Sequence, residues 1–93
     1  MELRFYLDAQ TGEPHLLKHG VSEQEVADVL ERPLEDRTGA EGSRVALGQT
    51  RDGRYLRVIY GPDPKPGSVF VITAYEIGPK ARRALRRRRR KKR

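Results

Sequence analysis

The sequence contains no cysteine and no tryptophan, and only 6% of its 93 residues are aromatic. Without cysteine, neither a disulfide framework nor a thiolate zinc site can form, which fits a reducing cytosol. No apolar stretch approaches the roughly 20 residues that a membrane-spanning helix needs. The N-terminal stretch "MELRFYLDAQ" also lacks the apolar run of a signal peptide. We therefore expect a single soluble domain in the cytoplasm.

Acidic residues are missing from the C-terminal segment. Residues 80–93 carry eleven lysines and arginines and no aspartate or glutamate, which leaves nine basic and all 13 acidic residues in the rest of the chain. A dense basic block favours an anionic partner, because neutralised phosphates release condensed counterions. We expect this partner to be nucleic acid. The alternatives are an acidic protein or membrane surface, or a tail that serves solubility alone.

Hydrophobic periodicity and turn residues predict the secondary structure. We expect strands over 2–7, 44–50, 55–60 and 68–75, a short helix over 11–19, and a loop or weakly ordered edge over 34–43. Ser22 and Glu25 form a capping box, so a second helix should run from there to about Glu31. Asp52 and Gly53 suit the tight turn of a hairpin. A third helix should begin near Pro79.

This order predicts an α+β fold, in which a small, mostly antiparallel sheet of four strands packs against two N-terminal helices. The hairpin and residues 68–75 should lie in the middle of the sheet, and a basic helix should follow. We assign residues 1–85 to one domain and residues 86–93 to a polybasic tail. We expect this tail to fray, because like charges at helical spacing repel and no apolar face offsets them.

Several side chains suit acid–base chemistry on a phosphodiester. RNA supplies its own 2′-hydroxyl nucleophile, so an enzyme needs a proton-transfer group and cations for the phosphate oxygens. The residues of these types are Lys18, His19, Arg44, Arg54, Tyr60, Tyr75 and Lys80. Each also has a structural interpretation, such as Lys18 at a helix end. His15 and His19 are spaced to share a helix face, but two ligands do not make a metal site, and we expect neither metal nor cofactor.

The motifs "FYLD", "KHGVS", "EVADVLERP", "RVALGQTRDGRYLRVIY" and "VITAYEIGPKARRA" resemble the BrnT-like toxins and the neighbouring family of small DUF4258 domains. The resemblance extends to about Leu85. It implies a RelE/BrnT-like fold and a ribonuclease toxin of a type II toxin–antitoxin system, neutralised by an antitoxin of ribbon-helix-helix type. Lys18 and His19 match the "KHG" pair, and Arg44 matches an arginine that opens a strand. Tyr75 replaces the arginine of the usual "ISAR", and Thr11 replaces a lysine of the first helix.

We therefore predict a metal-independent endoribonuclease toxin that leaves a 2′,3′-cyclic phosphate. Its catalytic residues would be Lys18, His19, Arg44 and Tyr75. RNA or the ribosome would be contacted by the basic residues Arg54, Lys80, Arg82, Arg83, Arg86, Arg87, Arg88, Arg89, Arg90, Lys91, Lys92 and Arg93. One alternative is a non-catalytic nucleic-acid-binding or ribosome-associated module. Another is an interaction domain whose sheet face binds a partner protein.

Overall fold

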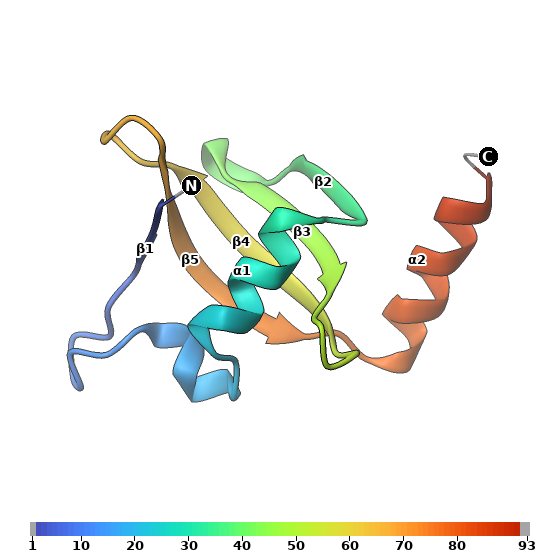
Figure 1. The fold of residues 1–93 in the computed structure, drawn as a ribbon, viewed down its shortest axis with the longest axis horizontal. Coiled ribbons are helices and arrows are strands. Elements are labelled where there is room, and N and C mark those ends of the chain that lie inside the picture. Colours follow the sequence, from blue (N-terminus) through green and yellow to red (C-terminus); the bar gives the residue numbers. More distant parts are fainter. Residues whose placement is uncertain (1, 92–93) are drawn as a thin grey trace.

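The computed structural model describes residues 2–91, which form one curved sheet with helices on both sides of it (Figure 1). Lys92 and Arg93, which we predicted to contact RNA, lie outside the described residues. The elements in chain order are β1 (Glu2–Phe5), η1 (His15–His19), α1 (Glu23–Glu31), β2 (Glu35–Thr38), η2 (Ala40–Gly42), β3 (Arg44–Gln49), β4 (Tyr55–Pro62), β5 (Ser68–Glu76) and α2 (Pro79–Lys91); η1 and η2 are 3-10 helices.

The sheet corrects the predicted fold class. It has five strands in the order β1-β5-β4-β3-β2, and it is mixed because β1 runs parallel to β5. The segment 34–43, which we predicted to be a loop or a weakly ordered edge, contains the edge strand β2, paired antiparallel with β3. Its sequence, "EDRT", contains no apolar residue and so shows no apolar alternation. Three of its four side chains are exposed. Pairing with β3, rather than local patterning, makes this segment a strand.

The prediction of two N-terminal helices is also wrong. Of the two predicted N-terminal helices only α1 is an α-helix, and η1 is a single 3-10 turn of five residues between Pro14 and Gly20. Pro14 precedes the turn in an extended conformation, and Gly20 ends it in the left-handed conformation with φ 71°. These two residues leave too little chain between them for an α-helix. The residues before Pro14 instead form turns, and Leu7 pairs with Pro14 in an isolated bridge.

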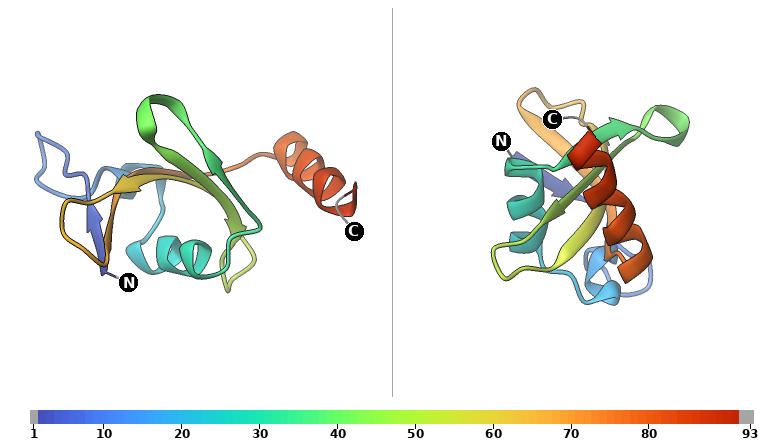
Figure 2. Two further views of the ribbon diagram at one scale, coloured as in Figure 1. Left: turned by 90° about the horizontal axis from the view of Figure 1, so that it is seen from above. Right: turned by 90° about the vertical axis from the view of Figure 1, so that its right-hand side faces the viewer.

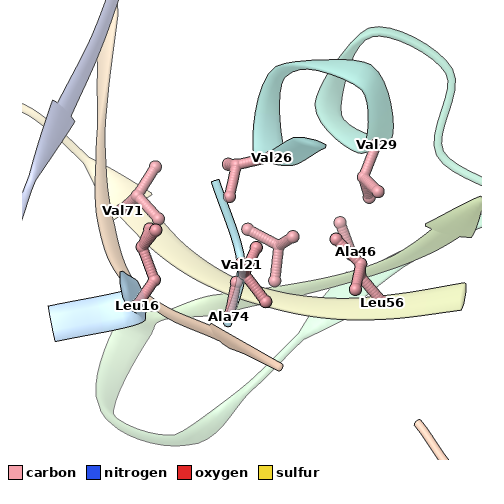
Figure 3. Packing of buried hydrophobic residues seen from close by; sticks show 9 residues of the cluster. Leu16, Val21, Val26, Val29, Ala46, Leu56, Val71 and Ala74 are labelled. Carbon is pink, nitrogen blue, oxygen red and sulfur yellow. The ribbon is translucent and has the colours of Figure 1, made fainter. Parts of the chain in front are cut away.

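The helix α1 begins and ends as its sequence predicts. Ser22 accepts a hydrogen bond from the backbone of Glu25, whose side chain accepts one from the backbone of Ser22, so the capping box is complete. Val26 and Val29 are fully buried between α1 and the sheet. Each contributes roughly 1.5–3 kcal/mol of hydrophobic stabilisation. The core of this face consists of Leu16, Val21, Val26, Val29, Ala46, Leu56, Val58, Val71 and Ala74 (Figure 3).

The opposite face of the sheet carries a smaller core. A buried cluster there consists of Leu47 from β3, Leu85 from α2, and Ile77 from the segment between β5 and α2. From this contact α2 projects past the end of the sheet, while α1 lies under the other face (Figure 2). Within residues 2–91, no helix has both the length and the apolar character needed to cross a bilayer.

The structure places the arginine run in a helix. The helix α2 continues to Lys91, six residues beyond its last buried apolar side chain, Leu85. Arg88 and Arg89 have partners on the neighbouring segment, in the Glu35 carboxylate and the Leu34 carbonyl. The isolated sequence of the helix could not reveal these contacts, and fraying of the run in solution stays a prediction.

Candidate functional site

Lys18 and His19 occupy the last two positions of η1, where the chain turns at Gly20 toward α1. The ammonium of Lys18 lies 2.6 Å from a carboxylate oxygen of Asp8. The hydrogen bond from Lys18, together with one from the backbone N–H of Gln10, lowers the pKa of Asp8 to about 2. Lys18 therefore ties the end of η1 to the turn after β1.

His19 has a different environment. It is exposed, and its ring stands edge-on to two aromatic rings, with centroids 5.3 Å from His15 and 6.1 Å from Tyr75. Its ring nitrogens have no hydrogen-bond partner among residues 2–91. His15, by contrast, lies 3.6 Å from the carboxylate of Asp8. His19 is therefore the histidine whose ring nitrogens are not bound by another residue of the described chain.

Tyr75 connects His19 to an arginine that the sequence patterns did not indicate. Arg57 of β4 is the register partner of Tyr75 on β5, and its guanidinium carbon lies 5.9 Å from the centre of the Tyr75 ring. The Nε of Arg57 is buried and has no partner within the described part of the chain. We call His19, Tyr75 and Arg57 the His19 cluster. It brings an imidazole, a phenol and a guanidinium together at the junction of η1, β4 and β5.

No pattern in the sequence indicated Arg57 as a candidate functional residue. A single arginine in "YLRVIY" is typical of the solvated face of a strand, and its proximity to Tyr75 follows only from the pairing of β4 with β5. The sequence pointed to this place only through Tyr75, which stands at the position of the arginine in the BrnT-like "ISAR" motif. In this fold a cation from the neighbouring strand lies beside that tyrosine.

Arg44 does not join the His19 cluster. It pairs in register with Tyr60, whereas Leu47, three residues farther along β3, pairs with Arg57. Arg44 is thus displaced from Tyr75 by roughly 10 Å along the strands and by two strand spacings, or roughly another 10 Å, across them. Its guanidinium binds Asp36, with Nε 2.9 Å from the carboxylate, and this contact raises the pKa of Arg44. A phosphate role for Arg44 remains a prediction.

Arg54, another predicted RNA contact, is occupied by intramolecular bonds. Its guanidinium donates to both carboxylate oxygens of Glu25, at 2.9 and 2.8 Å, and to Glu76 at 3.2 Å. It also donates to the carbonyl of Gly20 at 3.0 Å. Because Gly20 follows His19 directly, this bond fixes the end of η1 against α1 and β5. Arg54 therefore positions the turn that carries His19.

The basic residues of α2 fall into two groups. Arg88 binds both oxygens of Glu35 and Arg89 donates to Leu34, so these two fasten the helix. The second group is exposed and has no acidic partner in the described chain; it contains Lys80, Arg83, Arg86, Arg87, Arg90 and Lys91. Arg82 is half-buried, and its Nε is unpaired. The exposed group gives α2 a strongly cationic outer side.

The rings of His15 and His19 are neighbours, as a pair of metal ligands would be. The described residues nevertheless contain no group of three or more histidine, cysteine, aspartate or glutamate side chains placed to hold a metal ion. Asp8 approaches His15, but it is bound by Lys18. The geometry thus favours ring packing and a polar contact with Asp8 for His15.

One family model matches the chain. It is described as a domain of unknown function, DUF4258, and it covers residues 14–76, from the start of η1 to the end of β5. The match includes the whole His19 cluster and leaves β1 and α2 outside. No curated protein and no solved structure matches the chain.

Proposed function

This chain belongs to the DUF4258 family, and we propose that it is an endoribonuclease that cleaves RNA through the 2′-hydroxyl group. The observation that carries the proposal is the His19 cluster. An exposed imidazole without a hydrogen-bond partner in the described chain lies beside a phenol, and a guanidinium lies at 5.9 Å from the ring of that phenol. These three groups are the proton-transfer and anion-stabilising types that such a cleavage uses.

In the proposed reaction, His19 accepts the proton of the 2′-hydroxyl as its oxygen attacks the phosphorus. The new bond joins the 2′-oxygen to phosphorus, and the bond from phosphorus to the 5′-oxygen breaks. Arg57 donates hydrogen bonds to the phosphate oxygens, where negative charge accumulates. The hydroxyl of Tyr75 protonates the departing 5′-oxygen. The products are a 2′,3′-cyclic phosphate and a free 5′-hydroxyl, and proton exchange with water restores His19 and Tyr75.

Lys18 and Arg54 support this centre from outside it. Lys18 binds Asp8, and Arg54 binds the Gly20 carbonyl, so two separate contacts hold the C-terminal end of η1. These contacts thereby hold the His19 imidazole near Tyr75, although His19 stands on a short 3-10 helix and not on an α-helix. We assign both as positioning residues. Arg44 and Asp36, which lie beyond the cluster, have no part in this mechanism.

In the cell, we propose that this activity makes the protein a toxin of the BrnT-like kind, acting on RNA or on the ribosome. The "KHGVS" motif, with His19 in an exposed position, supports this role. A ribbon-helix-helix antitoxin would be its neutralising partner. Production of the chain in growing cells should then arrest growth and degrade RNA, and co-production of the product of an adjacent antitoxin-like reading frame should relieve the arrest.

The decisive experiment uses an RNA oligonucleotide with one 2′-deoxy substitution at the cleaved position, in the presence of a chelator. We expect the unsubstituted RNA to be cleaved and the substituted RNA to remain intact at that position. The His19→Ala variant should lose about 10²- to 10⁴-fold in rate, the range for a general acid or base. Its matched control is His15→Ala, which removes the neighbouring histidine. Cleavage of the 2′-deoxy substrate would refute the mechanism.

A second candidate function is non-catalytic binding of nucleic acid, and α2 is the observation that favours it. Its exposed arginines supply affinity whether or not the His19 cluster reacts. If the chain binds RNA but neither it nor His15→Ala cleaves any substrate, the binding function stands and the ribonuclease proposal fails.

A further inference from the structure

A groove with a volume of about 380 Å³ lies between α2 and the end of the β3–β4 hairpin. Its lining residues are Leu34, Gln49, Tyr55, Arg86, Arg89 and Arg90. This volume falls in the range of sites for small ligands. The groove lies outside the His19 cluster, and its α2 side lies beyond the residues of the family match, so neither the mechanism nor the family description accounts for it.

The groove contains a stacking surface. The guanidinium carbon of Arg86 lies 5.7 Å from the centre of the Tyr55 ring. Unpaired nucleobases stack on both aromatic rings and arginine planes. Gln49 uses its amide nitrogen to bind the Gly53 carbonyl at 3.2 Å, so its amide oxygen is left to accept a hydrogen bond from a ligand. A ring, a guanidinium and an amide oxygen are together suited to a base.

A row of arginines continues from the groove along the outer side of α2. Arg83, Arg86, Arg87 and Arg90 line one shallow hollow. Their spacing of three, four and seven residues places them on one face of the helix. From Arg83 to Arg90 the row extends about 10 Å at 1.5 Å per residue. Over this length the row presents four guanidinium groups to the phosphates of one strand. We call these four residues the arginine row.

Contacts of Arg88 and Arg89 fasten α2, and thereby hold the groove and the arginine row in place. Arg88 binds Glu35 at 2.7 and 2.9 Å, and Arg89 donates to the Leu34 carbonyl at 2.6 Å. Leu85 is fully buried against the sheet. The groove is therefore formed before any ligand arrives, which reduces the ordering cost of binding.

We propose that this surface binds single-stranded nucleic acid, with one base in the groove on Tyr55 and Arg86 and with adjacent phosphates on the arginine row. A duplex would leave Tyr55 unused, because its bases are stacked and paired. The choice of RNA over DNA rests on the proposed function. The binding site itself does not, because it shares no residue with the His19 cluster.

The test uses an oligonucleotide that the enzyme cannot cleave, so that binding is separated from catalysis. A 2′-O-methyl RNA strand carrying one 2-aminopurine has no free 2′-hydroxyl, and the fluorescence of this base falls when it stacks. We expect quenching on binding. Tyr55→Leu should abolish the quenching and weaken binding about 5- to 150-fold, which corresponds to roughly 1–3 kcal/mol for one stacked base. Tyr55→Phe keeps the ring and should bind as the unaltered chain does.

The matched control for Tyr55→Leu is Tyr6→Leu, which removes another tyrosine, an exposed one at the far end of the sheet. It should leave quenching unchanged. The same strand annealed to its complement should bind more weakly, and a DNA strand shows how far the sugar matters. Equal binding by Tyr55→Leu and Tyr55→Phe, or a duplex that binds as tightly as the single strand, would overturn the proposal.

The arginine row is tested by salt titration, which does not depend on the folding of the Tyr55 variants. The double variant Arg86→Gln, Arg87→Gln should reduce the slope of log affinity against log salt by about 1.4, or roughly 0.7 for each phosphate that is no longer neutralised. The control Arg32→Gln, Arg37→Gln has the same net charge and alters two exposed arginines elsewhere. It should keep the slope. Equal slopes in the two double variants would overturn the assignment to α2. Absence of cleavage with intact quenching would count against the ribonuclease proposal alone.

Discussion

The ammonium of Lys18 binds the carboxylate of Asp8 across ten residues of chain, with nitrogen and oxygen 2.6 Å apart. This pair joins the turn after β1 to the end of η1, on which His19 stands. The backbone N–H of Gln10 binds the other oxygen of the same carboxylate at 2.8 Å. The segment before the first helix is thus held by charge and hydrogen bonds in a region with little buried apolar surface.

This relationship predicts a pH dependence of stability. Lys18 and the Gln10 backbone lower the pKa of Asp8 to about 2, below its ordinary 3.8. A carboxyl with a lowered pKa in the folded state contributes stability above its unfolded pKa, and the contribution is lost as pH falls through the folded pKa. Between pH 4 and pH 2, the urea midpoint should therefore fall less for Asp8→Asn than for the unaltered chain. Glu31→Gln, which removes a carboxylate with no ion pair in the described structure, should follow the unaltered chain.

A second prediction separates the two arginines that compete for the phosphate role. Arg57→Gln should lower the rate of RNA cleavage by about 10²- to 10³-fold, the cost of removing one donor that stabilises an anion. Arg44→Gln should change the rate little, because Arg44 binds Asp36 at the other end of the strands. Single-turnover cleavage with excess protein measures both, and thermal melting shows that both variants are folded. A large loss in Arg44→Gln with none in Arg57→Gln would restore the role predicted for Arg44 from sequence.

A third prediction concerns the order of α2. Arg88→Gln breaks the ion pair with Glu35 and should reduce amide protection from about Leu85 to Lys91 in hydrogen exchange. Arg87→Gln removes the same charge from the adjacent, exposed position and should leave protection unchanged or slightly higher, because like-charge repulsion decreases. If the two variants exchange alike, the Glu35 contact does not hold the helix.

A fourth prediction tests the contact between α1 and β3. A Cβ added at Gly48 would lie 3.0 Å from a methyl carbon of Val29, so Gly48→Ala should overfill the core and lower the free energy of unfolding by about 1–3 kcal/mol. Val29→Ala should cost about 2 kcal/mol through reduced burial and a cavity. The double variant should lose less than the sum by at least about 0.5 kcal/mol, because each change relieves the other. Denaturant titration measures all three. Gly61→Ala, on β4 where the added Cβ meets no atom within 4 Å, is the control.

The sequence was sufficient where the physical cause is local. Ser22 and Glu25 determine the start of α1, because a capping box needs only residues three positions apart. Gly20 ends η1 and Gly53 turns the hairpin, both with positive φ, because glycine alone adopts that conformation at little cost. The basic character of α2 was also evident from composition.

Only the tertiary structure decided what lies beside what. β1 pairs in parallel with β5, and the polar "EDRT" becomes an edge strand, because hydrogen bonds to distant partners outweigh weak local patterns. The register of β4 with β5 placed Arg57 beside Tyr75, and the pairing of β2 with β3 left Arg44 with Asp36. A shift of one residue in that register would turn every one of these side chains to the other face. Glu35 likewise binds Arg88 of the arginine run from 53 residues away in the chain, a long-range contact that no pattern within the run contains.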